Sequence, residues 1–300
     1  IMPIPWTRPV LTNPVPAPIN PMVAPLNIFK AGFAKLAHGA INKLPPKLSR
    51  IKDAMHKGVC HVTGHPVDVV SGMLFTDEED FSLPGIIPLS WERTWYSDSV
   101  YKGPLGHGWY HNYDIGFYID EFNRGIYKMN DGKAAVFELP QPGKFTFNRN
   151  EKLFLHCHEV EKFYYITDKD GLIYRFTDKS YKDEFVKNGS RLLQSISNTN
   201  GYAIRFEYNN NGKLIKIIDS AGRVLVIEND AEGRITNIIA LHPTIPGSTF
   251  IIAHYDYDAD GNMTGHTDAL NQQMLFEYKN HLLIKETWRN GMNWYFVFDG

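Results

Sequence analysis

Several residues near position 60 are of types that bind metals or move protons. Cys60, His61 and His65 could supply three zinc ligands, but structural zinc normally takes four ligands in closely spaced pairs, so we expect a coincidental cluster and no metal site. The bond between His65 and Pro66 is a candidate cleavage site, because its amide nitrogen is tertiary and His65, His61 or Asp68 could assist proton transfer. The alternative is a turn that merely starts the first strand.

Three further clusters favour packing over chemistry. The acidic run Asp77–Asp80 lacks the alternating spacing of a calcium loop, so we expect a solvated loop. His107 and His111 flank Trp109 in a glycine-rich turn, which is typical of a packed aromatic corner. In the run His156–His158, strand alternation would direct both imidazoles to one face and the thiol to the other. No phosphate loop or dinucleotide fingerprint occurs, and we expect no cofactor.

The composition of the chain is that of a soluble globular protein. It has 300 residues, 43% of them hydrophobic and 21% charged, with a formal net charge of -2. A balance so close to neutral argues against a wholesale nucleic-acid-binding surface. No apolar run approaches the roughly 20 residues needed to cross a bilayer. With only Cys60 and Cys157 present, a disulfide framework is excluded.

The first 65 residues differ in charge and proline content from the rest. They hold ten of the 18 prolines and a formal charge of +7, which leaves -9 for the remainder. Frequent prolines predict an extended arm over residues 1–25. An amphipathic helix is expected from Asn27 to Leu44, with a second short helix less clearly indicated over 47–57. The apolar face of the first helix is our candidate partner-docking surface, and it includes Phe29, Phe33, Leu36 and Leu44.

After Pro66 the pattern becomes that of antiparallel strands. Short runs such as Ala203–Tyr208 are separated by Asp-Gly, Asn-Gly or Ala-Gly pairs, which supply the positive φ of tight hairpin turns. The second half also repeats: an aromatic residue, a polar turn and a glycine recur, with 21 residues between Gly212 and Gly233 and 28 between Gly233 and Gly261. Such a unit cannot bury a sheet face alone, so it must stack on its neighbours. We therefore predict a fragment of a longer array.

The repeats and the segment before them resemble a known family. The clearest repeat is YDYDADGNMTGHTD, from Tyr255 to Asp268, and it resembles the YD repeats of Rhs proteins and teneurins. The preceding stretch, GHPVDVVSGMLFTDEEDFSLPGIIPLSWERTWYSDS from Gly64 to Ser99 and GPLGHGWYHNYD from Gly103 to Asp114, looks like the lead-in to the shell of bacterial Rhs polymorphic toxins. Together the resemblances cover residues 60–300.

The resemblance implies a mainly β fold in which antiparallel YD-repeat hairpins form part of a spiral β-sheet shell. It divides the chain into three parts: a Pro-rich arm with short helices over 1–65 that serves as an anchor or plug, a β-rich lead-in segment over 66–195, and YD repeats over 196–300. The implied function is a structural container and delivery segment used in interbacterial competition, which encloses a C-terminal toxin. The alternative is a cell-surface adhesive or carbohydrate-binding YD-repeat protein.

Partners also follow from the resemblance. They are the remainder of the shell, the toxin, an immunity protein and a type VI secretion spike of VgrG and PAAR type. The protein would stay in the bacterial cytoplasm before delivery into a target cell. Some Rhs effectors are processed near the segment that corresponds to His65 and Pro66, which suggests self-cleavage there. The basic arm could bind nucleic acid, but we favour docking on the acidic shell or on the spike.

Overall fold

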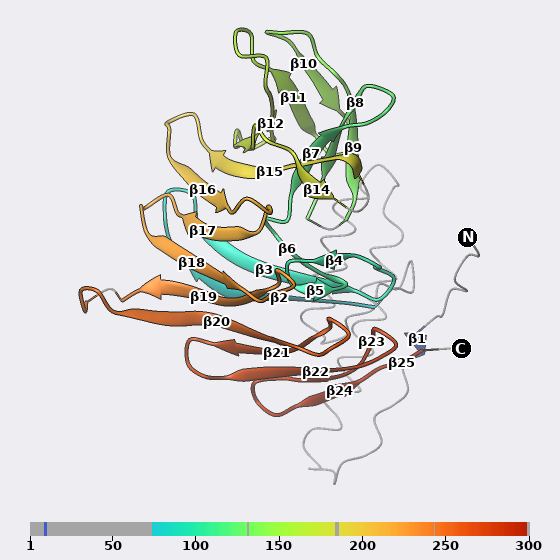
Figure 1. Cartoon of the computed structure of the whole chain (residues 1–300), viewed down its shortest axis with the longest axis vertical. Coiled ribbons are helices and arrows are strands. Elements are labelled where there is room, and N and C mark those ends of the chain that lie inside the picture. Colours follow the sequence, from blue (N-terminus) through green and yellow to red (C-terminus); the bar gives the residue numbers. More distant parts are fainter. Residues whose placement is uncertain (1–8, 11–73, 131, 184–185, 243, 299–300) are drawn as a thin grey trace, which may run out of the picture. The chain divides into compact units, whose positions relative to one another are not determined.

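The structure of the protein is a computed structural model that describes residues 9–10, 74–130, 132–183, 186–242 and 244–298. Within these ranges every regular element is a β-strand, as the sequence predicts (Figure 1). The helices expected over 27–44 and 47–57 lie outside the described residues. The described residues contain no helix of the length and apolar character needed to cross a lipid bilayer. Two compact units can be separated: unit 1 comprises residues 1–76, 95–100 and 274–300, and unit 2 comprises 77–94 and 101–273.

The strands that precede the repeats form a small sheet of their own. Its order is β2, β3, β6, with β2 at Phe75–Leu83, β3 at Leu89–Tyr96 and β6 at Trp109–His111, and we call these three the lead-in strands. Two short strands, β4 (Lys102–Gly103) and β5 (Gly106–His107), pair beside it. Burial alternates strictly along β3, and its inward side chains include Trp91 and Arg93, both fully buried. This alternation is what a half-buried strand requires.

Eight strands of unit 2 close on themselves, in the order β7, β8, β9, β10, β11, β12, β13 and β15. Seven of these neighbouring pairs are antiparallel ladders, with β15 paired to both β13 and β7, whereas β9 and β10 stand at the two ends of the hydrogen-bonded order. We call these eight strands the closed sheet, and they lie together in the upper part of Figure 1. Their bounds are β7 Gly116–Ile119, β8 Arg124–Lys128, β9 Ala134–Glu138, β10 Phe145–Asn148, β11 Leu153–Cys157, β12 Tyr164–Thr167, β13 Ile173–Phe176 and β15 Val186–Ser197. The short strand β14 (Tyr181–Asp183) pairs with β15.

The seam between β9 and β10 is joined by side chains. Thr146 donates its hydroxyl hydrogen to the carbonyl of Glu138 at 2.8 Å, and Asn148 donates an amide hydrogen to the carbonyl of Val136 at 3.0 Å. Inside the closed sheet, Phe117 packs against Phe176 with ring centroids 5.4 Å apart. The side-chain contacts of Thr146 and Asn148 lie at the facing edges of β9 and β10, the two end strands of the hydrogen-bonded order, and they cover edges that would otherwise invite pairing with other chains.

The repeats continue from β15 as a regular antiparallel meander in unit 2. Each strand pairs with the next, and β16–β17, β18–β19 and β20–β21 have a register shift beside the turn. The strands are β16 Ala203–Tyr208, β17 Leu214–Ile218, β18 Val224–Asn229, β19 Ile235–Leu241, β20 Thr249–Tyr257 and β21 Met263–Asp268. Their inward face is the core, where Ile204, Phe206 and Ile217 are almost fully buried. Burial of this apolar face against the lead-in strands drives the packing.

Unit 1 holds the last repeat strands. The strands β22 (Gln273–Lys279), β23 (Leu282–Thr287) and β24 (Asn293–Tyr295) are antiparallel, and β25 (Val297–Phe298) pairs with β1 (Pro9–Val10). Trp95 is 1% exposed and lies edge-on to Tyr278 at 6.2 Å between centroids. The pair joins the end of β3 to a repeat strand of the same unit.

Candidate functional site

The repeat turns share one hydrogen-bond pattern, built around an aspartate or asparagine. In the turn at Asp219, the carboxylate Oδ1 accepts the backbone N–H groups of Ala221 and Arg223 at 2.9 and 2.8 Å. Arg223 also donates its Nε–H to Oδ2 of Asp219 at 2.6 Å. Gly222 closes the turn with φ +84°, a conformation that glycine adopts without strain. The carboxylate thus accepts hydrogen bonds from backbone N–H groups that would otherwise have no partner in a sharp turn.

The same turn recurs along the chain with conservative variations. Arg234 binds Asp230 through Nε at 2.6 Å, and in the next repeat Asn262 binds Asp258 through Nδ2 at 2.8 Å. Where glycine is missing, an asparagine takes the positive φ, as at Asn123 and Asn271. Asparagine tolerates the left-handed region better than other non-glycine residues. The pattern from residue i to i+4 therefore defines the repeat turn.

A second set of contacts ties three successive hairpins to earlier strands. The residue just before the turn donates a side-chain hydrogen bond to a backbone carbonyl: Tyr208 to Leu193 at 2.8 Å, Asn229 to Leu214 at 2.9 Å and Tyr257 to Ile235 at 2.6 Å. The accepting positions 193, 214 and 235 are spaced by 21 residues, which is the repeat length seen in the sequence. We call these three contacts the carbonyl ladder. It links successive repeats.

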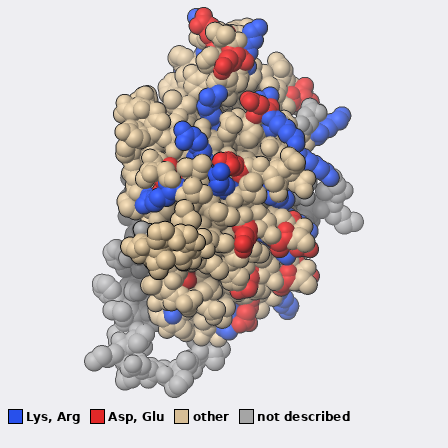
Figure 2. Space-filling view, turned by 60° about the vertical axis from the view of Figure 1, so that its left-hand side comes forward, with Lys and Arg blue, Asp and Glu red and all other residues tan. Residues whose placement is uncertain are grey.

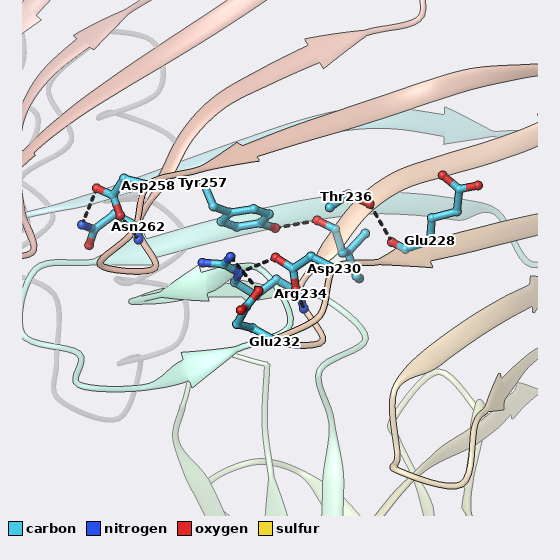
Figure 3. A network of polar contacts seen from close by, with 9 residues as sticks. Glu228, Asp230, Glu232, Arg234, Thr236, Tyr257, Asp258 and Asn262 are labelled. Carbon is cyan, nitrogen blue, oxygen red and sulfur yellow. Dashed lines mark hydrogen bonds and ion pairs between the residues drawn. The ribbon is translucent and has the colours of Figure 1, made fainter.

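Figure 3 shows one step of this arrangement, in which the two sets of contacts meet. The Arg234 guanidinium lies 4.6 Å from the centroid of the Tyr257 ring while it also binds Asp230. Burial, followed by the nearby Asp230 carboxylate, raises the pKa of Tyr257 well above its ordinary value. The tyrosine is therefore a permanent hydrogen-bond donor, which suits an architectural contact.

The segment that contains the lead-in strands meets the repeats through polar contacts within unit 2. Ser220 accepts the N–H of Ile87 at 3.0 Å and donates to the carbonyl of the same residue at 2.7 Å. The N–H of His107 binds the Gly261 carbonyl at 2.9 Å, and the N–H of Ile235 binds the Pro104 carbonyl at 2.7 Å. The segment that precedes the repeats is therefore hydrogen-bonded to the repeats at three places, Ser220, Ile235 and Gly261.

The acidic run Asp77–Asp80 is the place where the sequence interpretation was wrong. It lies in strand β2 and not in a solvated loop, and the side chain of Asp80 is fully buried. Asp80 binds Arg93 Nε at 2.9 Å and accepts the Tyr255 hydroxyl at 2.5 Å. The physical reason is the buried Arg93, which gives the carboxylate a charged partner inside the protein. A lone run of acids contains no local signal of such a distant partner.

The histidine clusters support packing, as the sequence predicts. Trp109 is fully buried, and His111 stacks on Trp91 with centroids 4.5 Å apart. In the third cluster, Cys157 is buried at the end of β11, and the half-buried His156 points to the opposite face, against Tyr165. Among the described residues, no group of three or more His, Cys, Asp or Glu side chains is placed to hold a metal ion.

A cavity of about 320 Å³ opens where the lead-in segment meets the first repeats in unit 2. Asp114 and Lys128 line it, with the ammonium 3.6 Å from the carboxylate and 4.0 Å from the centroid of the Tyr101 ring. His111 also lines the cavity. Its burial lowers its pKa to about 4, and its Nδ1 accepts the Tyr113 N–H at 3.2 Å. The imidazole is therefore neutral at physiological pH and carries its proton on Nε2.

The remaining predicted site residues lie outside the described part of the chain. They are the candidate cleavage bond between His65 and Pro66, the cluster of Cys60 and His61, and the candidate docking residues Phe29, Phe33, Leu36 and Leu44. These assignments stay predictions.

On the face that Figure 2 shows, the charged side chains are of both signs. Figure 2 shows Lys and Arg interspersed with Asp and Glu on the face turned toward the viewer. Cross-strand ion pairs also occur, such as Lys216 with Glu207 at 2.8 Å. Exposed pairs of this kind add little stability, typically about 0–1 kcal/mol.

Comparison with known proteins identifies the architecture. Residues 64–137 match the family model of a domain of unknown function, DUF6531, and residues 184–300 match that of the teneurin YD-shell. The chain belongs to the Rhs/YD-repeat family. The carbonyl ladder and the repeat turns are thus features of a YD repeat, and the lead-in strands of this Rhs chain coincide with the first match.

Relatives of this Rhs chain include named toxins. Double-stranded DNA deaminase toxin A of Burkholderia cenocepacia is 23% identical over 237 residues, which covers 77% of this chain and 16% of the relative. Probable deoxyribonuclease RhsA of Dickeya dadantii is 24% identical over 219 residues, which covers 71% of this chain and 14% of the relative. The chain thus spans about one sixth of these relatives or less.

A comparison of folds finds a crystal structure of TcdB2-TccC3, with a TM-score of 0.43 and 11% identity. The match covers 69% of this chain and 17% of that chain.

Proposed function

We propose that this chain is the container and delivery segment of an Rhs polymorphic toxin used in interbacterial competition. The observation that carries the proposal is the carbonyl ladder, in which three successive hairpins bind earlier strands at carbonyls spaced by 21 residues. Since every step uses the same contacts, further repeats can be added without changing those already formed. A sheet extended in this way can enclose a second polypeptide segment.

Enclosure suits a toxin, because it separates an enzyme from the cell that makes it. The relatives are named for DNA deamination and for deoxyribonuclease activity, while the matched regions cover only 16% and 14% of their lengths. We assign the toxin chemistry to a region outside these matches and a structural role to the residues described above.

Delivery completes the proposal. The basic, proline-rich arm docks on a secretion spike of VgrG and PAAR type or plugs the shell, through Phe29, Phe33, Leu36 and Leu44. An immunity protein neutralises the toxin in the producing cell, where the protein stays in the cytoplasm before its delivery into a target. Cleavage at or near the bond between His65 and Pro66 separates the arm from the shell while the two stay bound.

The test is to express the complete reading frame that contains this chain, purify the product, and measure intact masses with N-terminal sequencing of each polypeptide. We expect a shell fragment that begins at or near Pro66 and co-purifies with its arm and with a C-terminal fragment. Limited proteolysis should degrade the C-terminal region only after the shell is unfolded by denaturant. Replacement of Phe29 and Phe33 by Asp should release the arm.

Each part of the proposal has its own contrary result. A single uncut chain would reject cleavage near Pro66. Rapid digestion of the C-terminal region at protease concentrations that leave the repeats intact would reject enclosure. Co-purification of the arm with the shell after Phe29→Asp and Phe33→Asp would reject docking through the apolar helix face.

A further inference from the structure

The repeat hairpins are equivalent at one buried position, which makes their differences informative. In four hairpins the first strand carries a register shift just before its last or next-to-last residue. The facing pair two positions ahead of the residue that follows the shift points into the core. These cross-strand pairs are Phe206 with Ile217, Ile227 with Ile238, Tyr255 with His266, and Phe276 with Glu286. All eight residues are at most 4% exposed.

The first two of these hairpins carry apolar pairs, whereas the third, β20–β21, carries Tyr255 and His266. That polar pair lies against the ion pair of Asp80 and Arg93 from β2 and β3 of the same unit. The Tyr255 hydroxyl binds Asp80 Oδ2 at 2.5 Å, and His266 Nε2 lies 3.4 Å from Asp80 Oδ1. Trp91 donates its Nε1–H to the Tyr255 oxygen at 2.9 Å.

This cluster is closed to solvent. The side chains of Asp80, Arg93 and His266 are 0% exposed, and Tyr255 is 1% exposed. Burial is the largest influence and would lower the pKa of Arg93, but the nearby Asp80, Tyr255 and Glu78 together outweigh it, and the pKa is raised. The guanidinium also lies 4.8 Å from the centroid of the Trp109 ring. A buried ion pair of this kind is only weak evidence for stability, because desolvation opposes the attraction.

We infer that Asp80, Arg93, Tyr255 and His266 fix the register in which the lead-in strands dock on the repeat array. A repeat array offers several hairpins of nearly the same shape, so shape alone leaves the docking position ambiguous. If β2 and β3 docked one hairpin earlier, Ile227 and Ile238 would face Asp80 and Arg93 without a hydrogen-bonding atom. Buried polar groups that lack partners disfavour such a register strongly, and a single buried polar residue sets register in coiled coils in the same way.

The inference concerns the assembly of this chain and is independent of whether the chain encloses a toxin. It assigns the four residues a role in selecting the docking register. This role can be separated from a role in stability by replacing the whole cluster with apolar residues of similar volume. Such replacements often preserve or raise stability, since no charge is left without its partner. If the four residues served stability alone, the apolar variant would still adopt a single docking register.

The test compares the 300-residue chain with a quadruple variant, Asp80→Leu, Arg93→Met, Tyr255→Phe and His266→Ile. The readout is the set of indole N–H resonances after ¹⁵N-tryptophan labelling, because the Trp91 indole contacts Tyr255 directly. We expect one Trp91 resonance in the parent chain. In the variant it should split or broaden while the Trp288 and Trp294 resonances stay single and the urea midpoint is not lowered. A matched control, Phe206→Leu with Ile217→Val, should keep one resonance for each tryptophan.

A second pair of variants covers the case in which the quadruple variant does not fold. Gly85→Cys with Ser220→Cys forms a disulfide in the native register, because a Cβ at position 85 would lie 2.6 Å from Ser220 Oγ. Transplanting the polar pair one hairpin earlier, by Ile227→Tyr, Ile238→His, Tyr255→Ile and His266→Ile, should lower the yield of this disulfide. A single native Trp91 resonance in a folded quadruple variant, or an unchanged disulfide yield in the transplant, would overturn the inference.

Discussion

The hydroxyl of Tyr257 donates a hydrogen bond of 2.6 Å to the carbonyl of Ile235, across two neighbouring repeat strands. Ile235 is fully buried, and its own N–H binds the Pro104 carbonyl at 2.7 Å. Ile235, the first residue of β19, is thus hydrogen-bonded both to a side chain of the following repeat and to the backbone of the lead-in segment. The relationship shows how a YD repeat couples local turn chemistry to long-range packing.

Tyr257→Phe should therefore destabilise unit 2 with little change of shape. The change removes one donor and leaves the buried carbonyl of Ile235 without its side-chain partner, for which we expect a loss of about 1–3 kcal/mol. The measurement is urea unfolding followed by tryptophan fluorescence. Tyr202→Phe is the matched control, because Tyr202 is 44% exposed, and it should change stability by less than about 0.5 kcal/mol. Equal effects of the two changes would show that the ladder contact is not a stabilising one.

Two turn glycines allow a test that separates backbone strain from close packing. Gly212 and Gly222 have φ of +78° and +84°, so an alanine at either position is strained by about 1–2 kcal/mol. A Cβ at position 212 would also lie 2.8 Å from the Tyr181 ring, whereas nothing lies within 4 Å of a Cβ at position 222. Gly212→Ala should therefore cost more than Gly222→Ala, by about 1 kcal/mol or more. The two denaturation midpoints decide the matter, and similar midpoints would contradict the close packing of Tyr181.

Much of this architecture can be predicted from the sequence because hairpins are local. The Asn-Gly and Asp-Gly pairs do mark turns, with positive φ at Gly201, Gly212 and Gly261, and the strand predicted over Ala203–Tyr208 has those bounds. The turns at Asn123 and Asn271 were missed, because their positive φ is taken by asparagine in place of glycine. A search for the Asp-to-Arg spacing of four residues would have found the turn at Asp120.

The lead-in contacts could not be predicted, because their partners are distant in sequence. Ile87 and Ser220 are separated by 133 residues, and Trp91 and Tyr255 by 164. Neither hydrophobic period nor turn composition carries information about such pairs. The burial of Asp80 could not be predicted for the same reason. An acidic run is expected to be solvated unless its buried arginine partner is known.

The seam of the closed sheet gives a prediction about local opening. Thr146→Val together with Asn148→Leu removes both donors that join β10 to the carbonyls of Glu138 and Val136. We expect faster amide hydrogen exchange in β9 and β10, measured by mass spectrometry, with a change of less than about 1 kcal/mol in global stability because water can replace exposed donors. Exchange in β16–β19 is the internal reference. Unchanged exchange in β9 and β10 would mean that the seam does not depend on these side chains.

His111 gives a prediction about acid sensitivity. Burial lowers its folded-state pKa to about 4, below the ordinary value of 6.5, so the unfolded chain binds a proton more readily than the folded chain between these values. Its contribution to stability is therefore present above about pH 6.5 and is lost as the pH falls toward 4. His111→Gln removes this titration and keeps an acceptor for the Tyr113 N–H. Between pH 7 and pH 4.5, the variant should lose about 2 kcal/mol less unfolding free energy than the parent chain, as measured by urea titrations at both pH values. His158→Gln is the control for the substitution itself, because His158 lies in the partly exposed segment that follows β11. If His111→Gln and the parent chain lose the same unfolding free energy between the two pH values, His111 is not a source of the acid sensitivity.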